Sequence, residues 1–208
     1  MEDLTCIGIG DFTSALASVS PTPGGGGAAA LCGALASSLC AMAVSLTAGR
    51  KKYADRTALL LETAARAEEL RQRLVLLVQE DAVNFAPLAA AYSLPRSDPD
   101  TPSLLRAATL GACEAPLEML RCACAVTELL EQARTLSSPL LISDVGCGAA
   151  LARAAIECAA MNVLVNTRTL PEDAESCHFR DEVLRLRAEY LPRAEAVSAA
   201  VAACLNEI

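Results

Sequence analysis

Apolar residues recur every three or four positions along most of this chain, which is the spacing of a buried or half-buried helix. No stretch alternates apolar and polar side chains as a half-buried β-strand does. The pattern therefore predicts an all-α fold, a bundle of about six helices with several long ones, in a single domain over residues 1–208. The expected helices are Asp11–Val19, Gly27–Ala48, a third from Asp55 into the eighties, Ser103–Leu136, Leu141–Thr167 and Asp173–Asn206.

Capping and breaking residues mark the expected helix ends. Asp11 is the predicted N-cap of the first helix, and Gly49 follows the second helix where a C-terminal glycine is favoured. Pro87 is expected to kink or end the third helix, because proline lacks the N–H that a helix needs. For the same reason we expect a kink at Pro116 and a disturbance at Pro192.

A segment of 26 residues, Gly24 to Gly49, carries no charge and is long enough to span a membrane. It is rich in Gly, Ala, Ser and Cys and lacks the aromatic belt of a membrane span. We therefore expect a helix buried on all sides by other helices and no membrane association. The sequence shows no secretory signal, which predicts a cytoplasmic protein.

Composition and charge narrow the kinds of ligand and site that this protein is expected to have. The chain has 17 basic and 25 acidic residues and a net charge of −8, which argues against nucleic-acid binding. Its ten cysteines stand mostly in Ala/Leu-rich runs, where reduced thiols act as small apolar side chains. His178 is the only histidine, which disfavours a histidine-based triad, and without a Cys-x-x-Cys pair we expect no metal site.

Four consecutive glycines follow Pro23 at the head of the charge-free helix. Exposed backbone N–H groups and the partial positive charge of a helix N-terminus together suit an anion or a polar ring edge. The alternative is a turn that needs glycine for conformational freedom and close packing. The candidate binding residues are Pro23, Gly24, Gly25 and Gly26.

Arg50, Lys51 and Lys52 form a basic connector, followed by Tyr53. Cations after a helix C-terminus complement its dipole, and three of them beside a Tyr also suit carboxylate recognition. Both interpretations stay open from the sequence.

Asp81 places a carboxylate on an apolar helical stripe that contains Leu70, Leu74 and Leu77. Desolvation there would raise its pKa, as a general acid or base requires. The alternative is a structural hydrogen bond to a neighbouring helix end. Tyr92 rejoins the same stripe if the helix continues.

Asp144 and Asn162 are 18 residues apart, five helical turns, so they share a face of the fifth helix, and Asn166 lies one turn further. Asp144 also fits the role of an N-terminal helix cap. A capping role would account for Asp144, but it would not account for the two Asn residues at the other end of the same stripe.

Together these segments resemble a known family. They are Ser20–Gly26, Gly49–Tyr53, Glu80–Phe85 with Ala91-Tyr92, and Ile142–Gly146 followed by Ala160–Val163. The chain is similar, from about Thr5 to the last helix, to the family that includes formiminotetrahydrofolate cyclodeaminase and the small bacterial methenyltetrahydrofolate cyclohydrolases.

The resemblance implies a stand-alone, all-helical homodimer that binds folate near the glycine loop. It implies hydrolysis of 5,10-methenyltetrahydrofolate to 10-formyltetrahydrofolate, or formation of the methenyl form from 5-formiminotetrahydrofolate with release of ammonia. Neither reaction asks for a metal or redox cofactor. Asp144, Asp81 and Asn162 are then the catalytic candidates, and the basic run around Lys51 would meet the glutamate tail of folate. The substrate-binding set is Pro23, Gly24, Gly25, Gly26, Lys51, Lys52, Tyr53, Tyr92 and Asn166.

Two positions depart from the family pattern. Gly27 stands where a Ser is expected, which removes a hydroxyl donor from the loop, and Pro87 interrupts an expected helix. The alternative function is therefore a non-catalytic helical folate-binding or scaffold protein that has lost the activity.

Overall fold

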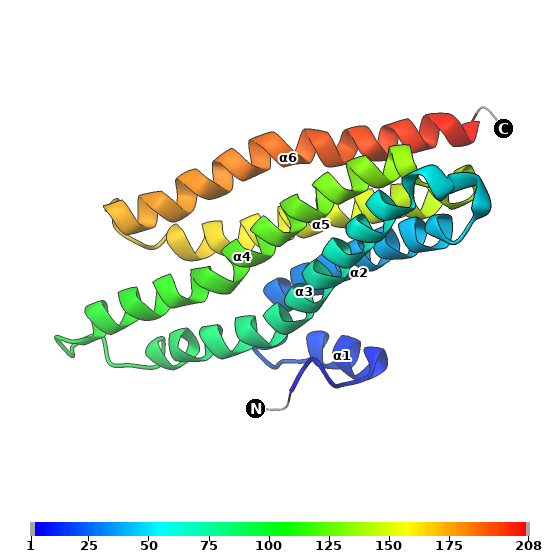
Figure 1. Cartoon of the computed structure of the whole chain (residues 1–208). Helices are drawn as coiled ribbons and strands as arrows, with labels where there is room; N and C mark the ends of the chain where they lie inside the picture. Colours follow the sequence, from blue (N-terminus) through cyan, green and yellow to red (C-terminus); the bar gives the residue numbers. More distant parts are fainter. Residues whose placement is uncertain (1–2, 207–208) are drawn as a thin grey trace.

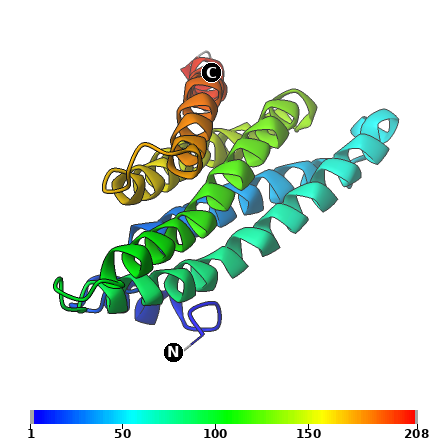
Figure 2. The ribbon, with the colours of Figure 1, turned by 90° about the vertical axis from the view of Figure 1, so that its left-hand side faces the viewer.

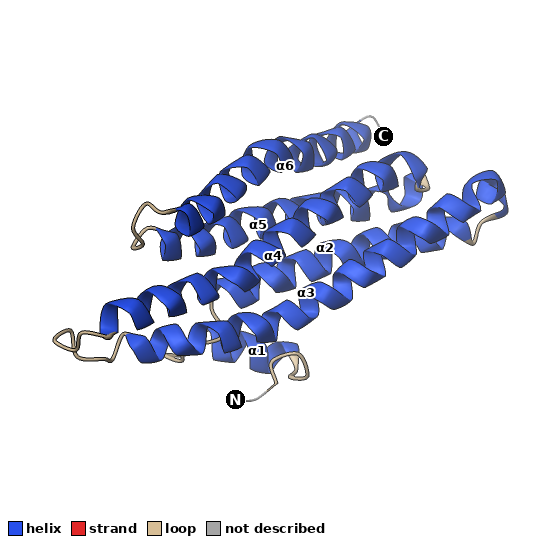
Figure 3. Ribbon diagram, turned by 60° about the vertical axis from the view of Figure 1, so that its left-hand side comes forward, coloured by secondary structure: helices blue, strands red, loops and turns tan. Residues whose placement is uncertain are grey.

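Every regular element among residues 3–206, which the computed structural model describes, is helical (Figures 1 and 3). The all-α prediction with six helices, several of them long, is confirmed. The helices are α1 (Ile9–Leu16), α2 (Gly25–Ala48), α3 (Thr57–Ala91), α4 (Thr101–Leu136), α5 (Ile142–Thr167) and α6 (Ala174–Asn206), with 3₁₀ helices η1 (Lys51–Arg56) and η2 (Pro139–Leu141).

The five long helices pack in two layers. One layer contains α3, α4 and α6 in that order, and the other contains α2 beside α5 (Figure 2). α4 is central and contacts α2, α3, α5 and α6. The outer face of the α2–α5 layer therefore points away from α4.

Small residues allow α2 to approach its neighbours closely. A Cβ added to Gly33 of α2 would lie 3.0 Å from Leu74 of α3 and 3.6 Å from Ala155 of α5. A Cβ on Gly148 of α5 would lie 2.8 Å from Leu130 of α4. These contacts explain the Gly- and Ala-rich composition of α2 and α5. Residue 33 of α2 faces residue 155 of α5, and residue 36 faces residue 148, so the two helices run antiparallel.

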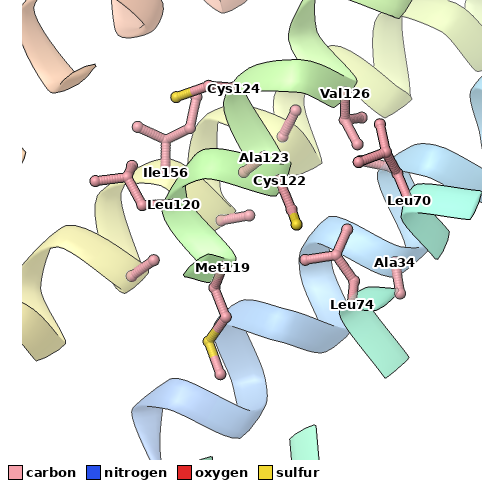
Figure 4. Packing of buried hydrophobic residues seen from close by; sticks show 14 of the residues in the cluster. Ala34, Leu70, Leu74, Met119, Leu120, Cys122, Ala123, Cys124, Val126 and Ile156 are labelled. Carbon is pink, nitrogen blue, oxygen red and sulfur yellow. The ribbon is translucent and has the colours of Figure 1, made fainter. Parts of the chain in front are cut away.

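The core between the layers consists of Leu, Val, Ile, Met, Ala and Cys side chains (Figure 4). Cys122 and Cys124 are buried there, and burial raises the pKa of the Cys124 thiol to about 12. All ten cysteines are unpaired. The prediction that they are free thiols is confirmed, although Cys6, Cys147 and Cys204 are exposed rather than packed.

The predicted cap of the first helix is wrong. α1 begins at Ile9 with Gly8 as its N-cap, and Asp11 lies in the first turn. The Gly8 carbonyl already accepts a hydrogen bond from the N–H of Phe12 (2.9 Å). Burial of the Phe12 side chain fixes where this short helix sits, and a capping preference worth about 1 kcal/mol does not override that packing.

Of the two outcomes expected at Pro87, the end of the helix is wrong and the kink stays a prediction. α3 continues to Ala91, and both Leu88 and Ala91 are buried, so packing holds the helix beyond the proline. Pro116 and Pro192 also lie inside continuous helices. The third helix starts at Thr57 instead of Asp55, because the connector before it forms η1, and α2 starts two residues before the predicted Gly27.

The expectation that α2 is buried on all sides is also wrong within one chain. Leu35, Met42 and Leu46 are exposed on its outer side. By length and composition, three described helical stretches are apolar enough to cross a membrane: Gly25–Ala48, Lys51–Ala91 and Pro139–Thr167. The absence of membrane association therefore stays a prediction.

Candidate functional site

The N-terminus of α2 lies between one carboxylate and one carboxamide. A Cβ added to Gly26 would lie 2.5 Å from Cγ of Asp81, on α3, which no real side chain tolerates. A Cβ added to Gly25 would lie 3.2 Å from Nδ2 of Asn162, on α5. We call Gly25, Gly26, Asp81 and Asn162 the glycine-loop cluster. The structure therefore brings together these four residues, which the sequence had singled out in three separate motifs.

Asp81 has the environment of a tuned acid or base. The side chains of Leu70, Leu74 and Leu77 on the same stripe are buried, as predicted. The Asp81 carboxylate accepts a hydrogen bond from the backbone N–H of Gly27. Burial raises the pKa of Asp81 to about 6 against the opposing effect of that hydrogen bond. No Lys or Arg among the described residues forms an ion pair with it, so no cation opposes the effect of burial on its pKa.

Asn162 is held in a fixed orientation by its own helix. Its Nδ2 donates to the carbonyl of Cys158, 2.8 Å away, which leaves the amide oxygen as an acceptor beside the glycine loop. Asn166, one turn further, donates to the carbonyl of Ala112 on α4 at 3.2 Å. In this structure the Asn166 amide therefore joins α5 to α4 instead of facing the loop.

Gly27 contributes a backbone hydrogen-bond donor to the loop, a role that the sequence did not predict. Its N–H is the donor to Asp81, and a Cβ at this position would lie 3.3 Å from Cβ of Pro23 and 3.8 Å from the ring of Phe12. A serine side chain would have to fit against these groups, and the donor to Asp81 in this chain is the backbone N–H of Gly27. Phe12, from α1, is the other supporting residue that we did not predict, and its only sequence signal was an aromatic side chain in a short amphipathic helix.

Tyr92 lies apart from the cluster. It is exposed at the C-terminal end of α3, eleven residues beyond Asp81, which is about 16 Å along the helix. There it lines a cavity of about 550 Å³ together with Arg106, Thr109 and Leu170. The expectation that Tyr92 rejoins the apolar stripe is therefore wrong.

The basic connector lies at the other end of the bundle (Figure 1, cyan). Lys51 and Lys52 are exposed on η1, after the 24 residues of α2, which separate them from the glycine loop by about 36 Å. Tyr53 is buried, with the Lys52 ammonium 5.8 Å and the Arg56 guanidinium 5.6 Å from its ring centre. Tyr53 therefore packs the connector against the bundle and orients its cations.

Asp144 also lies at this distant end. It is half-buried in the first turn of α5, whose N-cap is Leu141, so it is not the cap residue. Asp144 and Asn162 share a helical face as predicted, but 18 residues of helix place them about 27 Å apart. We call Lys51, Lys52 and Asp144 the distal cluster.

Other features do not add to the cluster. A cavity of about 780 Å³ lies between α3 and α4 and is lined by Val83, Pro87 and Leu104, on the side of α3 away from Asp81. Among residues 3–206, no three His, Cys, Asp or Glu side chains gather as a metal site would require.

Comparisons with known proteins identify the family of this chain. The formiminotransferase-cyclodeaminase family profile matches residues 8–185. A protein of Methylorubrum extorquens named methenyltetrahydrofolate cyclohydrolase is 36% identical over 179 residues, which make up 84% of each chain. The crystal structure of formiminotetrahydrofolate cyclodeaminase from Thermotoga maritima superposes with a TM-score of 0.83 and 25% identity, covering 97% of each chain. The chain therefore belongs to the formiminotransferase-cyclodeaminase family of folate one-carbon enzymes.

Proposed function

We propose that this protein hydrolyses 5,10-methenyltetrahydrofolate to 10-formyltetrahydrofolate at the glycine-loop cluster. The observation that carries the proposal is the desolvated, unpaired carboxylate of Asp81, held against a glycine loop and opposite Asn162. The similarity to the Methylorubrum cyclohydrolase supports hydrolysis as the reaction.

The chemistry of the methenyl bridge fits these groups. The bridge is an amidinium cation, which a nearby carboxylate stabilises, and its carbon is attacked by water. Asp81 takes a proton from that water as the C–O bond forms, which is general base catalysis by a group whose pKa is near the working pH. The bond from the carbon to one folate nitrogen then breaks as the new hydroxyl loses its proton and becomes the formyl carbonyl. The departing nitrogen keeps the electron pair and takes a proton, so the reaction releases one proton overall. The Asn162 amide and the N–H groups at the head of α2 are placed to orient the pterin and the developing oxyanion.

Formation of the methenyl bridge from 5-formiminotetrahydrofolate is the second candidate, favoured by the similarity to the Thermotoga cyclodeaminase. In this reaction the second folate nitrogen attacks the formimino carbon, and ammonia leaves after it is protonated. The same carboxylate would take the proton from the attacking nitrogen, so the cluster suits both reactions.

A direct assay separates the two activities and the non-catalytic alternative. Purified protein is incubated with 5,10-methenyltetrahydrofolate and, separately, with 5-formiminotetrahydrofolate, and the methenyl absorbance and released ammonia are followed against enzyme-free blanks. We expect accelerated loss of methenyl absorbance. Ammonia release alone would identify a cyclodeaminase, and no turnover of either substrate would leave a binding or scaffold protein.

The pH dependence of kcat/KM should report Asp81. A base acts only when ionised, so we expect kcat/KM to fall about tenfold for each pH unit below about 6 and to level off above it. The measurement is a pH profile of initial rates, corrected with enzyme-free blanks because the substrate itself reacts with water. A rate that stays constant from pH 5 to pH 8 would contradict the assignment of Asp81 as the base.

The connector lies about 36 Å from the glycine-loop cluster of the same chain, so a role of its lysines in binding the folate tail requires a second copy of the chain, and replacing them tests that role. We expect Lys51→Ala and Lys52→Ala each to raise KM about two- to fivefold for polyglutamylated folate, the free energy of an exposed ion pair, with little change in kcat. The increase should be smaller for the monoglutamate. Arg66→Ala, which removes an exposed cation from α3, is the control and should leave both KM values unchanged. Equal changes for the two substrates in the lysine variants would remove the role in tail binding.

A further inference from the structure

The cavity of about 780 Å³ between α3 and α4 has no part in the proposed folate site. α3 and α4 run antiparallel and are joined by residues 92–100, so the cavity is a groove between the two arms of a helical hairpin (Figure 3). It extends along α4 from Leu104 to Glu114, ten residues or about 15 Å. Its lining is mostly apolar, and Val83 and Leu104 are both 51% exposed, so the groove is open to solvent. We call it the α3/α4 groove.

A glycine in this groove is not explained by the packing of the chain. Gly111 lies inside α4, where glycine is about 1 kcal/mol less favourable than alanine. A Cβ added to it would meet no atom within 4 Å, in contrast to Gly33 and Gly148, whose neighbours leave no room for a side chain. Gly111 therefore leaves space beside α4 that no described part of the chain fills.

Pro87, a position at which the chain departs from the family pattern, leaves an acceptor in the same groove. Proline has no N–H, so the carbonyl of Val83, one turn earlier on α3, lacks the donor that a helix normally provides. Both residues line the groove, so this carbonyl lies in its wall. Asn84 also lines the groove, and its amide oxygen is a second acceptor at this end.

The groove continues at this end into a smaller cavity of about 190 Å³, and Asn84 and Glu114 line both. The smaller cavity is charged, and its three carboxylates outnumber its two guanidinium groups. These are the side chains of Glu80, Glu114 and Glu118 and those of Arg73 and Arg121.

Glu114 is left without a cation in this cavity. Arg73 donates two hydrogen bonds to Glu80, at 2.5 and 3.0 Å. Arg121 donates two to Glu182, both at 2.8 Å. Glu114 itself forms no hydrogen bond or ion pair through its side chain within residues 3–206. The polar end of the groove therefore presents acceptors and an unpaired negative charge, while the nearby cations are engaged.

We propose that the α3/α4 groove binds an apolar primary amine, with its apolar body along the groove and its ammonium group beside Glu114. An ammonium group has three donors and no acceptor, which matches a carboxylate, an amide oxygen and the carbonyl of Val83. The volume and the mostly apolar lining are typical of small-molecule sites, in which a few polar groups fix the orientation of the ligand. This site is separate from the glycine-loop cluster and does not depend on the proposed folate activity.

Binding of n-octylamine tests the site without any folate. Wild-type protein is titrated at pH 7 with n-octylamine, 1-octanol or octanoate, and the backbone amide chemical shifts are followed by NMR. We expect the amine to shift the amides around Asn84 and Gly111, with a Kd of about 0.1–1 mM for a ligand of this size. The alcohol should bind about three- to tenfold more weakly, because it lacks the charge. Octanoate should bind more weakly still, because its carboxylate meets Glu114.

Two variants separate the charge from the groove. Glu114→Gln should bind the amine about three- to tenfold more weakly and 1-octanol as before. Gly111→Leu places a side chain in the open space and should weaken both ligands about tenfold or more. The matched controls are Glu62→Gln, an exposed carboxylate of α3 without an ion pair in the described chain, and Ala65→Leu, an exposed position of the same helix. Both should bind like the wild type.

Several results would overturn the proposal. These are equal affinity of the wild type for the amine and the alcohol, amide shifts that lie outside the groove, or unchanged amine affinity in Glu114→Gln. Groove amides whose shifts depend on protein concentration alone would also overturn it, because a second copy of the chain would then cover the groove. Circular dichroism confirms that each variant has folded. If Gly111→Leu does not fold, the comparison of Glu114→Gln with Glu62→Gln still decides the outcome.

Discussion

Asp81→Asn is expected to lower kcat by about 10²–10⁴-fold, the usual contribution of a positioned acid or base. The substitution keeps the size of the side chain and an oxygen that can accept the hydrogen bond from Gly27. It removes the negative charge, and with it both the capacity to take a proton from the attacking water and the stabilisation of the amidinium cation. KM should change less than kcat, because the lost interaction belongs to the transition state.

The same variant is expected to be more stable than the wild type at neutral pH. Burial raises the pKa of Asp81 from 3.8 to about 6, so between these values the folded state holds a proton that the unfolded state has released. The free energy of unfolding therefore falls as the pH rises from about 4 to about 6, and the full cost is present above that range. Asparagine removes this cost, which is on the order of 3 kcal/mol.

Thermal unfolding at several pH values checks this expectation. The melting temperature of Asp81→Asn should exceed that of the wild type at pH 7, and the two should converge below about pH 4. A variant that is inactive but less stable than the wild type at pH 7, with the difference disappearing at low pH, would show that Asp81 is ionised and paired in the folded state. Such a trade between stability and activity is common where a strained or desolvated group performs the chemistry.

Gly26→Ala is expected to reduce kcat by about 10²-fold or more. The new Cβ would lie 2.5 Å from Cγ of Asp81, so the carboxylate must move from its position beside the loop. Moving a catalytic carboxylate away from the reacting atoms is sufficient for a loss of about 10²-fold in rate. The backbone of Gly26 is helical and Ala favours a helix by up to about 1 kcal/mol, so an effect on activity cannot come from helix propensity.

Two other glycines provide matched controls. Gly111 lies inside α4 with no atom within 4 Å of an added Cβ, so Gly111→Ala should keep full activity and gain about 0.5–1 kcal/mol of stability. The Cβ of Gly25→Ala would lie 3.2 Å from the amide nitrogen of Asn162, so this variant should lose an intermediate amount of activity. Activity in Gly26→Ala equal to that of Gly111→Ala would show that the position of the Asp81 carboxylate does not limit the rate.

The sequence by itself determined the helices and the faces of their side chains. Helical periodicity placed Asp81 among buried leucines, and it placed Asn162 and Asp144 on a common face of α5; both placements hold in the structure. The four motifs in order also indicated the folate enzyme family, which the comparisons confirm. Local residue preferences were less reliable at helix ends. Burial of Phe12 placed the start of α1 before Asp11, and burial of Leu88 continued α3 beyond Pro87.

Only the tertiary structure decided which of these residues meet. The rise of each helix separates residues that share a face, so Asp144 lies far from Asn162, although the periodicity aligns them. Asp81 meets the glycine loop because α2 begins between α3 and α5, and this placement depends on packing among helices far apart in sequence. The need for glycine at positions 25 and 26 has the same origin, since the close contacts there come from α3 and α5 and not from the turn itself. A pattern along one chain specifies the face of each helix, but the packing of the helices determines which ends lie together.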